Sequence, residues 1–213
     1  MVMYFANPST PAILEKIHAG YIGFIDTPLQ GNVRPPGIAW CADNGCFGKG
    51  FNEDNWWGWL QRHAGEAGTC WFATAPDVVG DAEATLARSR PWLPRIRALG
   101  YRAAYVAQDG SDEFPPPWGE FDVLFLGGTT EFKLGPVARE LVAEGRRRGV
   151  PSHMGRVNSH RRYRYAETIG CASVDGTHLT FAPDRTLPEL LGWVRSIRDE
   201  LPLFHLHDEE TLA

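Results

Sequence analysis

The stretch Val123-Leu-Phe-Leu-Gly-Gly128, followed by an amphipathic segment over 137–148 and a second short run over 152–154, decides the fold class. Four apolar residues closed by two glycines are typical of a buried strand, and the segment after them has helical periodicity. A strand, a helix and another strand in this order form a unit whose two strands are parallel. This part of the chain therefore predicts an α/β protein with a parallel sheet.

The same alternation recurs along the 213 residues. Strand-like runs are expected at Met3–Phe5, Tyr21–Ile25, Gly37–Cys41, Cys70–Thr74, Ala103–Ala107, Val123–Leu126, Ser152–Met154 and Ala172–Val174. Helical patterns are expected at Pro11–His18, Glu53–Ala67, Ala82–Leu99, Val137–Arg148, Ser159–Ile169 and Leu187–Leu201. Eight such strands predict a compact (β/α)8 TIM barrel near that fold's minimum of roughly 200 residues, with a doubly wound open sheet as the alternative.

The residues that close these runs favour the barrel over the open sheet. Polar residues or glycines end nearly all of them: Asp26, Asp43, Asp77, Gln108, Gly127-Gly128, Gly155-Arg156 and Asp175. Barrel enzymes take their functional groups from the carboxyl ends of many strands, whereas an open sheet concentrates them at one crevice. The distribution of polar strand ends is that of a barrel.

The composition, 43% hydrophobic and 22% charged, is that of a globular protein. No run approaches the roughly 18 to 20 apolar residues of a membrane helix, and the first residues lack the basic segment of a secretory signal. We expect one cytoplasmic domain over 1–213, with an acidic tail at about 203–213. The four cysteines include no C-x-x-C pair and no nucleotide-binding glycine motif occurs, so we expect neither zinc, another metal, nor a cofactor.

The charge of the chain is unevenly distributed. Its formal net charge is −5, which gives no general attraction for nucleic acid. Between Arg139 and Arg164, however, eight arginines stand against two glutamates, a local balance of +6. This segment is a candidate contact for a polyanion, and the alternative is a pair of solvated helix faces.

Three aspartates follow expected strands and precede loops: Asp43, Asp77 and Asp175. Each can be explained as a turn former, because Asp-Asn-Gly and Asp-Gly sequences bond to their own backbone. In a barrel, however, all three converge on one mouth. Carboxylates that share a cleft push their pKa values apart, so that one can act as a nucleophile and another as an acid or base.

Several motifs resemble those of queuine-type tRNA-guanine transglycosylases, in order, from about residue 38 to residue 180. Asp43-Asn-Gly-Cys-Phe47 resembles their Asp-Ser-Gly-Gly-Phe, Val106-Ala-Gln-Asp-Gly110 their Val-Gln-Gly-Gly, and Leu126-Gly-Gly128 their Ile-Gly-Gly. Met154-Gly155 and Ser173-Val-Asp175 resemble their Met-Gly and the strand that ends at their nucleophile.

The departures from that pattern point to one branch of the family. Asp109 replaces a family glycine, and nothing after Asp175 contains a cysteine for the family's zinc subdomain. A compact, zinc-free form resembles the phage and bacterial enzymes that insert 7-deazaguanine bases into DNA, as do the stretches Arg156-Val-Asn-Ser159 and Asp175-Gly-Thr177.

That resemblance implies a function: exchange of guanine in DNA for a 7-deazaguanine resembling preQ0, through a covalent glycosyl-aspartate. Asp175 would be the nucleophile and Asp43 the proton donor and acceptor. Asp77 can accept from the N1–H and 2-amino groups of guanine, and Gln108 can bond its six-position carbonyl. The base would lie against the backbone of Gly127, Gly128 and Gly155, with Met154 as an apolar plate.

The DNA partner has to present its base flipped out or single-stranded, with its phosphates held nearby. Helix N-termini after the seventh strand of a barrel are common phosphate sites. The expected phosphate contacts are Arg156, Asn158, Ser159, Arg161 and Arg162, extended by Arg146–Arg148. Three alternatives remain: a tRNA-guanine transglycosylase, a nucleoside or DNA N-glycosidase using water with the same aspartates, and a non-catalytic nucleic-acid-binding barrel.

Overall fold

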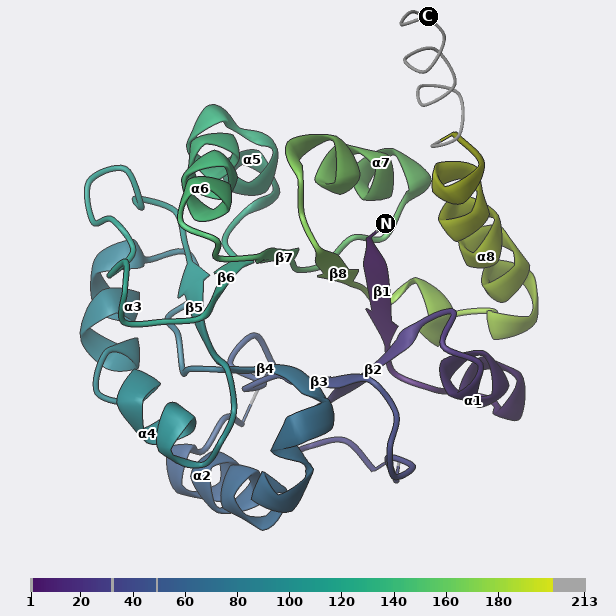
Figure 1. The fold of residues 1–213 in the computed structure, drawn as a ribbon, viewed down its shortest axis with the longest axis horizontal. Helices are drawn as coiled ribbons and strands as arrows, with labels where there is room; N and C mark the ends of the chain where they lie inside the picture. The colour runs from purple at the N-terminus through teal and green to yellow at the C-terminus, as the bar shows by residue number, and fades with distance from the viewer. Residues whose placement is uncertain (1, 32, 49, 201–213) are drawn as a thin grey trace, which may run out of the picture.

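The computed structural model describes residues 2–31, 33–48 and 50–200, the last four by their backbone alone. Eight parallel strands close into a barrel in sequence order, and helices surround it (Figure 1). The strands are β1 (Met3–Ala6), β2 (Gly23–Asp26), β3 (Trp40–Ala42), β4 (Cys70–Thr74), β5 (Ala103–Ala107), β6 (Val123–Leu126), β7 (Ser152–Met154) and β8 (Ser173–Asp175). β1 closes on β8, with Phe5 opposite Asp175. The predicted (β/α)8 barrel is confirmed.

The helices follow the predicted patterns with two differences. They are α1 (Pro11–His18), α2 (Glu53–Arg62), α3 (Ala82–Ser89), α4 (Leu93–Ala98), α5 (Thr130–Leu134), α6 (Pro136–Arg147), α7 (His160–Ile169) and α8 (Pro183–Glu200), with short 3-10 helices at Ala64–Thr69 and His178–Thr180. The helix predicted over 82–99 is divided, because Pro91 interrupts it; Pro94 lies in the first turn of α4, where proline is tolerated. The short α5 escaped prediction; Thr129 caps it by accepting from the amide of Phe132.

Alternation along the strands produces two apolar layers. One set of side chains fills the barrel interior: Phe5, Cys41, Phe72, Ala104, Val106, Val123 and Phe125. The other set faces the helices, where Trp40, Trp56 and Leu60 are almost fully buried. Successive strand residues point to opposite faces, so each strand supplies both layers. The filled interior makes the barrel a rigid support for the groups at the ends of its strands.

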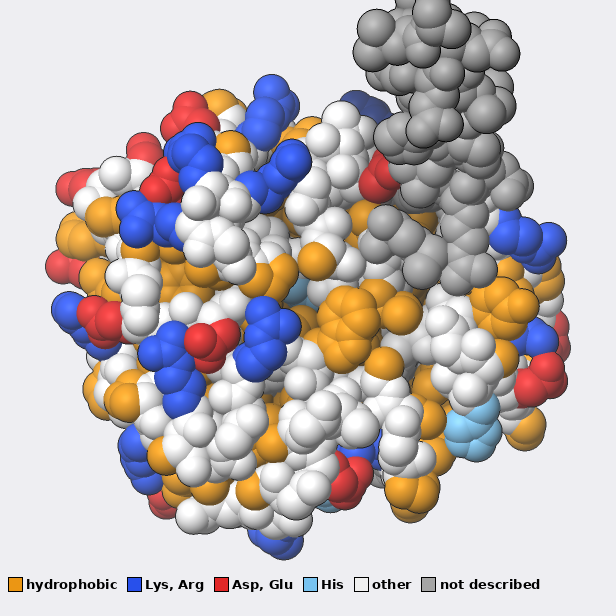
Figure 2. Space-filling model, in the orientation of Figure 1, with side chains coloured by type: hydrophobic (Ala, Val, Ile, Leu, Met, Phe, Trp, Pro, Cys, Tyr) orange, Lys and Arg blue, Asp and Glu red, His pale blue; other side chains and the backbone are white. Residues whose placement is uncertain are grey.

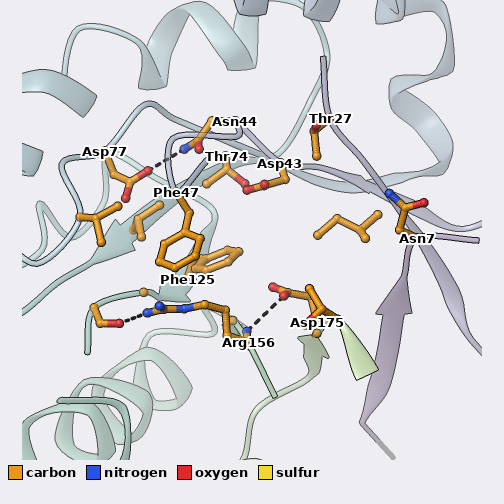
Figure 3. A pocket seen from close by; sticks show the side chains of 18 of the residues that line it. Asn7, Thr27, Asp43, Asn44, Phe47, Thr74, Asp77, Phe125, Arg156 and Asp175 are labelled. Carbon is orange, nitrogen blue, oxygen red and sulfur yellow. Dashed lines mark hydrogen bonds between the residues drawn. The ribbon is translucent and has the colours of Figure 1, made fainter. Parts of the chain in front are cut away.

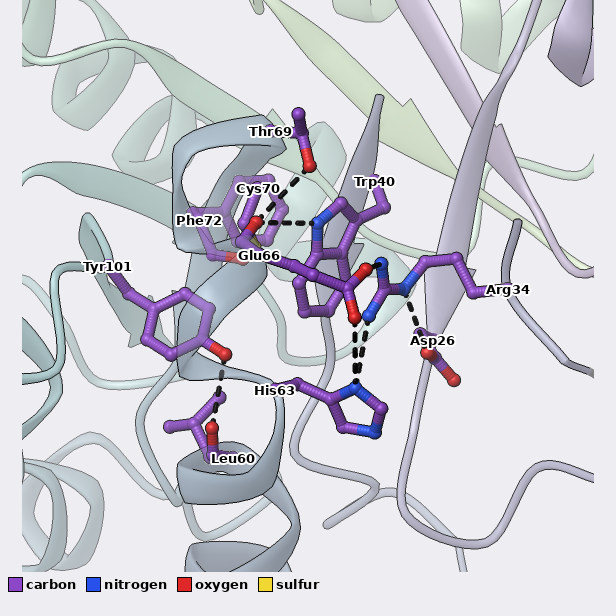
Figure 4. Close-up of polar contacts among 10 residues, drawn as sticks. All are labelled: Asp26, Arg34, Trp40, Leu60, His63, Glu66, Thr69, Cys70, Phe72 and Tyr101. Carbon is purple, nitrogen blue, oxygen red and sulfur yellow. Dashed lines mark hydrogen bonds and ion pairs between the residues drawn. The ribbon is translucent and has the colours of Figure 1, made fainter. Parts of the chain in front are cut away.

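The described residues of the connection between β2 and β3, 27–31 and 33–39, form no helix, and a polar cluster covers the wall there (Figure 4). The guanidinium of Arg34 stacks on Trp40, with its central carbon 3.6 Å from the ring centroid. It donates from Nε to Oδ2 of Asp26 at 3.2 Å and also donates to Glu66. The side chains of Arg34 and Asp26 are only 3% and 8% exposed. We name Asp26, Arg34 and Glu66 the wall cluster.

Figures 1 and 2 view the barrel from the end at which its strands begin. Hydrophobic side chains close the centre of this end, and basic and acidic side chains are interspersed around it (Figure 2). The last turn of α6 leads into β7 and so lies at this end, where Arg147 and Arg148 both bond to Glu144. The expectation that Arg146–Arg148 extend a nucleic-acid track near the strand ends is corrected by this placement.

Two further expectations concern the periphery. None of the helices in the described part of the chain combines the length and apolar character of a membrane span. The acidic tail expected at about 203–213 lies outside the described residues.

Candidate functional site

A pocket of about 270 Å³ opens at the carboxyl ends of the strands (Figure 3). It is lined by eight of the thirteen predicted site residues: Asp43, Asp77, Gln108, Gly127, Gly128, Gly155, Arg156 and Asp175. They come from β3 to β8 and the loops that follow these strands. The barrel therefore brings together residues that are up to 132 positions apart in the chain.

Asp77 is held rigidly at one side of the pocket. Its Oδ1 accepts from Nδ2 of Asn44 at 2.8 Å, and its Oδ2 accepts from Nε2 of Gln108 at 2.6 Å. The oxygen of the Gln108 amide accepts in turn from the Gly80 amide at 2.9 Å, which orients that side chain. Burial raises the pKa of Asp77, while the hydrogen bond from Asn44 works in the opposite direction. The side chain of Cys46 is a further hydrogen-bond partner of this carboxylate.

The two glycines after β6 provide space for these groups. A Cβ at Gly127 would come within 2.6 Å of Val106 and 2.7 Å of the Gln108 amide nitrogen. Gly128 has φ of +65°, and a Cβ there would lie 2.6 Å from Oδ2 of Asp109. That carboxylate accepts from the Thr129 amide at 2.8 Å and so secures the turn. The pocket floor beside Gln108 therefore consists of bare backbone.

Asp175 ends β8 on the other side of the pocket (Figure 3). Its Oδ1 accepts from the Arg156 amide at 3.1 Å. Its Oδ2 lies 2.9 Å from Nε2 of His153, a residue buried inside the barrel. Hydrogen bonds to both oxygens hold the carboxylate at the pocket wall.

Asp43 points into the same pocket from the end of β3. Burial is the main cause that raises its pKa, to about 7, and the carboxylates of Asp175 and Asp77 add to it. The amide of Gly45 donates to Oδ2 at 3.3 Å and lowers the pKa somewhat. Near neutral pH this group can both give and take a proton. We name Asp43, Asp77 and Asp175 the mouth cluster.

An arginine and an aromatic ring partly cover the pocket. The central guanidinium carbon of Arg156 lies 4.3 Å from the ring centroid of Phe47, and the same guanidinium donates to the carbonyl of Gly128. Arg156 has φ of 60°, a backbone strain of the kind that often marks functional sites. Phe47 is 65% exposed, so it is available to an incoming ligand.

The predicted role of Met154 as an apolar plate is corrected. Its side chain packs in the outer layer between strands and helices and does not line the pocket. The side-chain alternation of β7 explains the difference, because His153 takes the inward position. Phe47, Val106 and Phe125 supply the apolar walls of the pocket instead.

The remaining predicted residues lie at the start of α7. Ser159 is the N-cap and accepts from the Arg162 amide at 3.4 Å. Ser159, Arg161 and Arg162 line a second hollow, with Leu134 and Tyr165. Asn158 instead accepts from the Thr177 amide at 2.7 Å through its side-chain oxygen, so it ties two loops together. A cationic hollow thus lies beside the main pocket, on the side of Arg156.

Three residues at the site were not predicted from the sequence. Asn44 belongs to the Asp-Asn-Gly turn, and its role was hidden because a turn explains it equally well. His153 follows no motif that marks it. Lys133 is buried at 4% exposure and donates to the Gly155 carbonyl at 2.9 Å, while burial lowers its pKa to about 8. Only the tertiary packing places Lys133 behind the turn that carries Arg156.

The donor set points to acid–base and nucleophilic chemistry. Among the described residues, no group of three or more His, Cys, Asp or Glu side chains is arranged to hold a metal ion. Burial raises the pKa of the Cys46 thiol to about 12, so this thiol is neutral near neutral pH. In the mouth cluster, the pKa of Asp43 is near neutral, Asp175 is held by two donors, and Asp77 is fixed by two amide side chains.

The comparisons with known proteins bear on the fold. No family model matches the chain, and no curated protein matches its sequence. A solved structure described as native KDPGal has a TM-score of 0.56 at 12% identity, covering 93% of this chain and 94% of that one. A ligand-free tryptophan synthase from M. tuberculosis has a TM-score of 0.53 at 13% identity, covering 91% and 90%. At these identities the similarity shows one property, the (β/α)8 barrel fold.

Proposed function

We propose that this protein is a DNA-guanine transglycosylase, which exchanges guanine for a 7-deazaguanine base through a covalent bond to Asp175. The observation that carries the proposal is that two carboxylates in different electrostatic and hydrogen-bonding surroundings line one pocket. Asp43 has a pKa of about 7, and Asp175 receives hydrogen bonds at both oxygens. Such a pair can supply an acid and a nucleophile at the same pH.

The exchange then runs in two balanced steps. A lone pair of Asp175 forms a bond to C1′ while the C1′–N9 bond breaks, and its electron pair passes to guanine, which takes a proton from Asp43. The incoming 7-deazaguanine returns a proton to Asp43 and bonds to C1′, and the bond to Asp175 breaks with its electron pair returning to the carboxylate. Covalent catalysis replaces one difficult displacement by two easier ones.

The far side of the pocket suits the polar edge of a purine. The carboxylate of Asp77 can accept from N1–H and the 2-amino group, and the second amide hydrogen of Gln108 can reach the six-position carbonyl. The rings of Phe47 and Phe125 offer flat apolar faces to a planar base. The pocket volume of about 270 Å³ lies just below the usual roughly 300 to 1,000 Å³ of ligand sites, which suits one nucleobase.

DNA as the polymer is supported by the motif resemblance and by the cationic hollow beside the pocket. A base can enter a barrel mouth only when it is flipped out or unpaired, at a cost of a few kcal/mol. Arg161 and Arg162 line that hollow, and with the N-terminus of α7 they would bind a neighbouring phosphate. Phosphate binding there would offset the cost of extruding the base.

The test uses a single-stranded oligodeoxynucleotide containing guanine, incubated with the protein and 7-cyano-7-deazaguanine, followed by digestion and nucleoside mass spectrometry. We expect the deazaguanine nucleoside in the DNA and free guanine in equal amount. Asp43→Asn and Asp175→Asn should abolish both products, whereas Asp26→Asn, outside the pocket, should leave exchange intact.

Other outcomes assign the alternatives. Guanine release without incorporation would identify an N-glycosidase, and incorporation into tRNA alone would identify an RNA enzyme. Binding of the oligonucleotide without either reaction would leave a nucleic-acid-binding barrel. Each of these results would overturn the proposal.

A further inference from the structure

His153 has an unusual position for a charged or polar side chain. It lies in the middle of β7, points into the barrel and has no exposed surface. Its Nε2 lies 2.9 Å from Oδ2 of Asp175, and its Nδ1 lies 2.8 Å from Oγ of Ser173. In the β7–β8 ladder, His153 is directly paired with Ser173. Both ring nitrogens are therefore engaged by β8.

Aromatic rings enclose the imidazole on its other sides. The ring centroids of Phe125 and Phe72 lie 4.6 and 4.9 Å from that of His153, and Phe5 lies at 6.2 Å. A buried polar ring in such surroundings has to satisfy both nitrogens by hydrogen bonding. The packed rings also prevent the imidazole from turning away. Its orientation toward Asp175 is thus fixed from both sides.

We infer that His153 is a positioning residue for Asp175: its Nε2–H holds one carboxylate oxygen, and the hydroxyl of Ser173 fixes the imidazole by donating to Nδ1. An ionised carboxylate can only accept, so Nε2 has to carry the hydrogen. With the Arg156 amide on Oδ1, both carboxylate oxygens are then held by donors from β7 and the turn that follows it. This inference deepens the proposed function and rests on it where it assigns Asp175 as nucleophile.

Loss of this hydrogen bond should affect the rate of adduct formation and not the affinity for the base. If Asp175 lost the Nε2–H bond, its carboxylate could rotate about the remaining bond to Arg156, and a misplacement of about 1 Å can cost on the order of 100-fold in rate. Asp77 and Gln108, the groups proposed to bind the polar edge of the base, are held by Asn44, by Gly80 and by each other. Recognition of that edge should therefore be preserved when His153 is replaced.

The kinetic test measures single-turnover formation of the covalent protein–DNA adduct. His153→Leu should slow adduct formation about 100-fold, and His153→Gln, which keeps an amide donor, about 10-fold, with the Kd for guanine unchanged. Ser173→Ala should slow it several-fold. The matched control is Ser152→Ala, a buried serine of β7, beside His153 in the chain, that faces Gly145 of α6. Its adduct rate should equal that of the wild type.

A wild-type adduct rate in the three variants of His153 and Ser173 would overturn the inference while leaving the proposed function in place. An equal loss of guanine affinity and rate would also overturn it, because it would indicate general distortion. Thermal midpoints show whether each variant folds. If His153→Leu fails to fold, the adduct rates of His153→Gln and Ser173→Ala test the inference.

The second test needs no activity. In protein labelled with ¹⁵N in its histidine rings, long-range NMR correlations report which nitrogen is protonated, and loss of one signal in His153→Gln assigns His153. We expect a protonated Nε2 whose shift changes in Asp175→Ala. An unprotonated Nε2, or an Nε2 chemical shift that is unchanged in Asp175→Ala, would overturn the inference. This readout does not depend on adduct formation. Absence of an adduct in the wild type would count separately, against the proposed function.

Discussion

Asp26 and Asp43 end neighbouring strands, and the amide of Asp43 donates to the carbonyl of Asp26 at 2.8 Å, yet their side chains have opposite surroundings. Asp26 points outward into the wall cluster, where Arg34 compensates its charge. Asp43 points into the mouth cluster, where its main electrostatic neighbours are the carboxylates of Asp175 and Asp77. Two aspartates one strand apart therefore belong to different kinds of site.

The pKa values of Asp26 and Asp43 reflect these different surroundings. Burial raises the pKa of Asp26, and the hydrogen bond and charge of Arg34 oppose that effect. For Asp43, burial and neighbouring carboxylates act in the same direction and bring the pKa to about 7. A compensated carboxylate supports the structure, whereas an uncompensated one becomes a proton carrier at neutral pH. Removing each group should therefore affect different properties of the protein.

The largest effect is expected at the mouth cluster. Asp175→Asn removes the proposed nucleophile, and adduct formation should fall at least about 10⁴-fold while the thermal midpoint stays close to that of the wild type. The measurement is denaturing electrophoresis of protein incubated with labelled single-stranded DNA. A persistent adduct in Asp175→Asn would transfer the nucleophile role to another residue.

The next effect is expected at the wall cluster and concerns stability. Arg34→Met leaves the buried carboxylate of Asp26 without its partner, which should lower the free energy of unfolding by about 3 to 5 kcal/mol. Urea denaturation measures the loss, and the double variant with Asp26→Leu should recover most of it. Adduct formation by the folded protein should be unchanged. A loss below about 1 kcal/mol would show that the wall cluster does not stabilise the barrel.

The third prediction uses the pH dependence of stability. The pKa of Asp43 rises from its ordinary 3.8 to about 7 on folding, so between these values the folded state binds more protons than the unfolded state. The free energy of unfolding therefore falls as pH rises from about 4 to 7, and the loss is complete above the folded pKa.

Asp43→Asn removes that dependence. The variant should match the wild type near pH 4 and exceed its unfolding free energy by roughly 2 to 4 kcal/mol at pH 8, although it loses exchange activity. Denaturant titrations at both pH values measure this. Equal pH profiles for the two proteins would contradict the proton-carrier role of Asp43.

The smallest effect is expected beside the mouth, at α7. Replacing Arg161 and Arg162 by Gln should weaken binding of single-stranded DNA about tenfold and reduce the salt dependence of binding by roughly one counterion for each arginine. The matched control replaces Arg147 and Arg148, which lie at the opposite end of the barrel, and should leave affinity unchanged. Unchanged affinity and salt dependence in the first variant would remove α7 from the DNA contact.

Much of the fold could be predicted, because each element carries a local signal. The eight strand runs and the major helices follow from apolar periodicity, and the boundaries differ by a few residues. Where prediction failed, the signal was weak or interrupted: Pro91 divides a helix, and α5 has only five residues. The convergence of Asp43, Asp77 and Asp175 on one pocket followed from the barrel prediction itself, since parallel strand ends meet at one face.

The site could be predicted only in part, for a different reason. Strand-end residues such as Gln108 and Gly127 can be predicted from their place after an apolar run. The side chain of Met154 faces the helix layer, and that of His153 faces inward, because the barrel closure sets the phase of the three-residue strand β7. A run this short gives no pattern from which to read its phase.

The amino-acid sequence by itself determined the parallel eight-stranded architecture and the set of polar groups at its strand ends, since periodicity and turn chemistry are local. The tertiary structure alone decided which carboxylates have a compensating charge, because charge compensation depends on how loops and strands pack against one another. Arg34 reaches Asp26 through an irregular loop, and His153 reaches Asp175 across β7 and β8. Those contacts, and the burial around them, separate a structural aspartate from a proposed catalytic one.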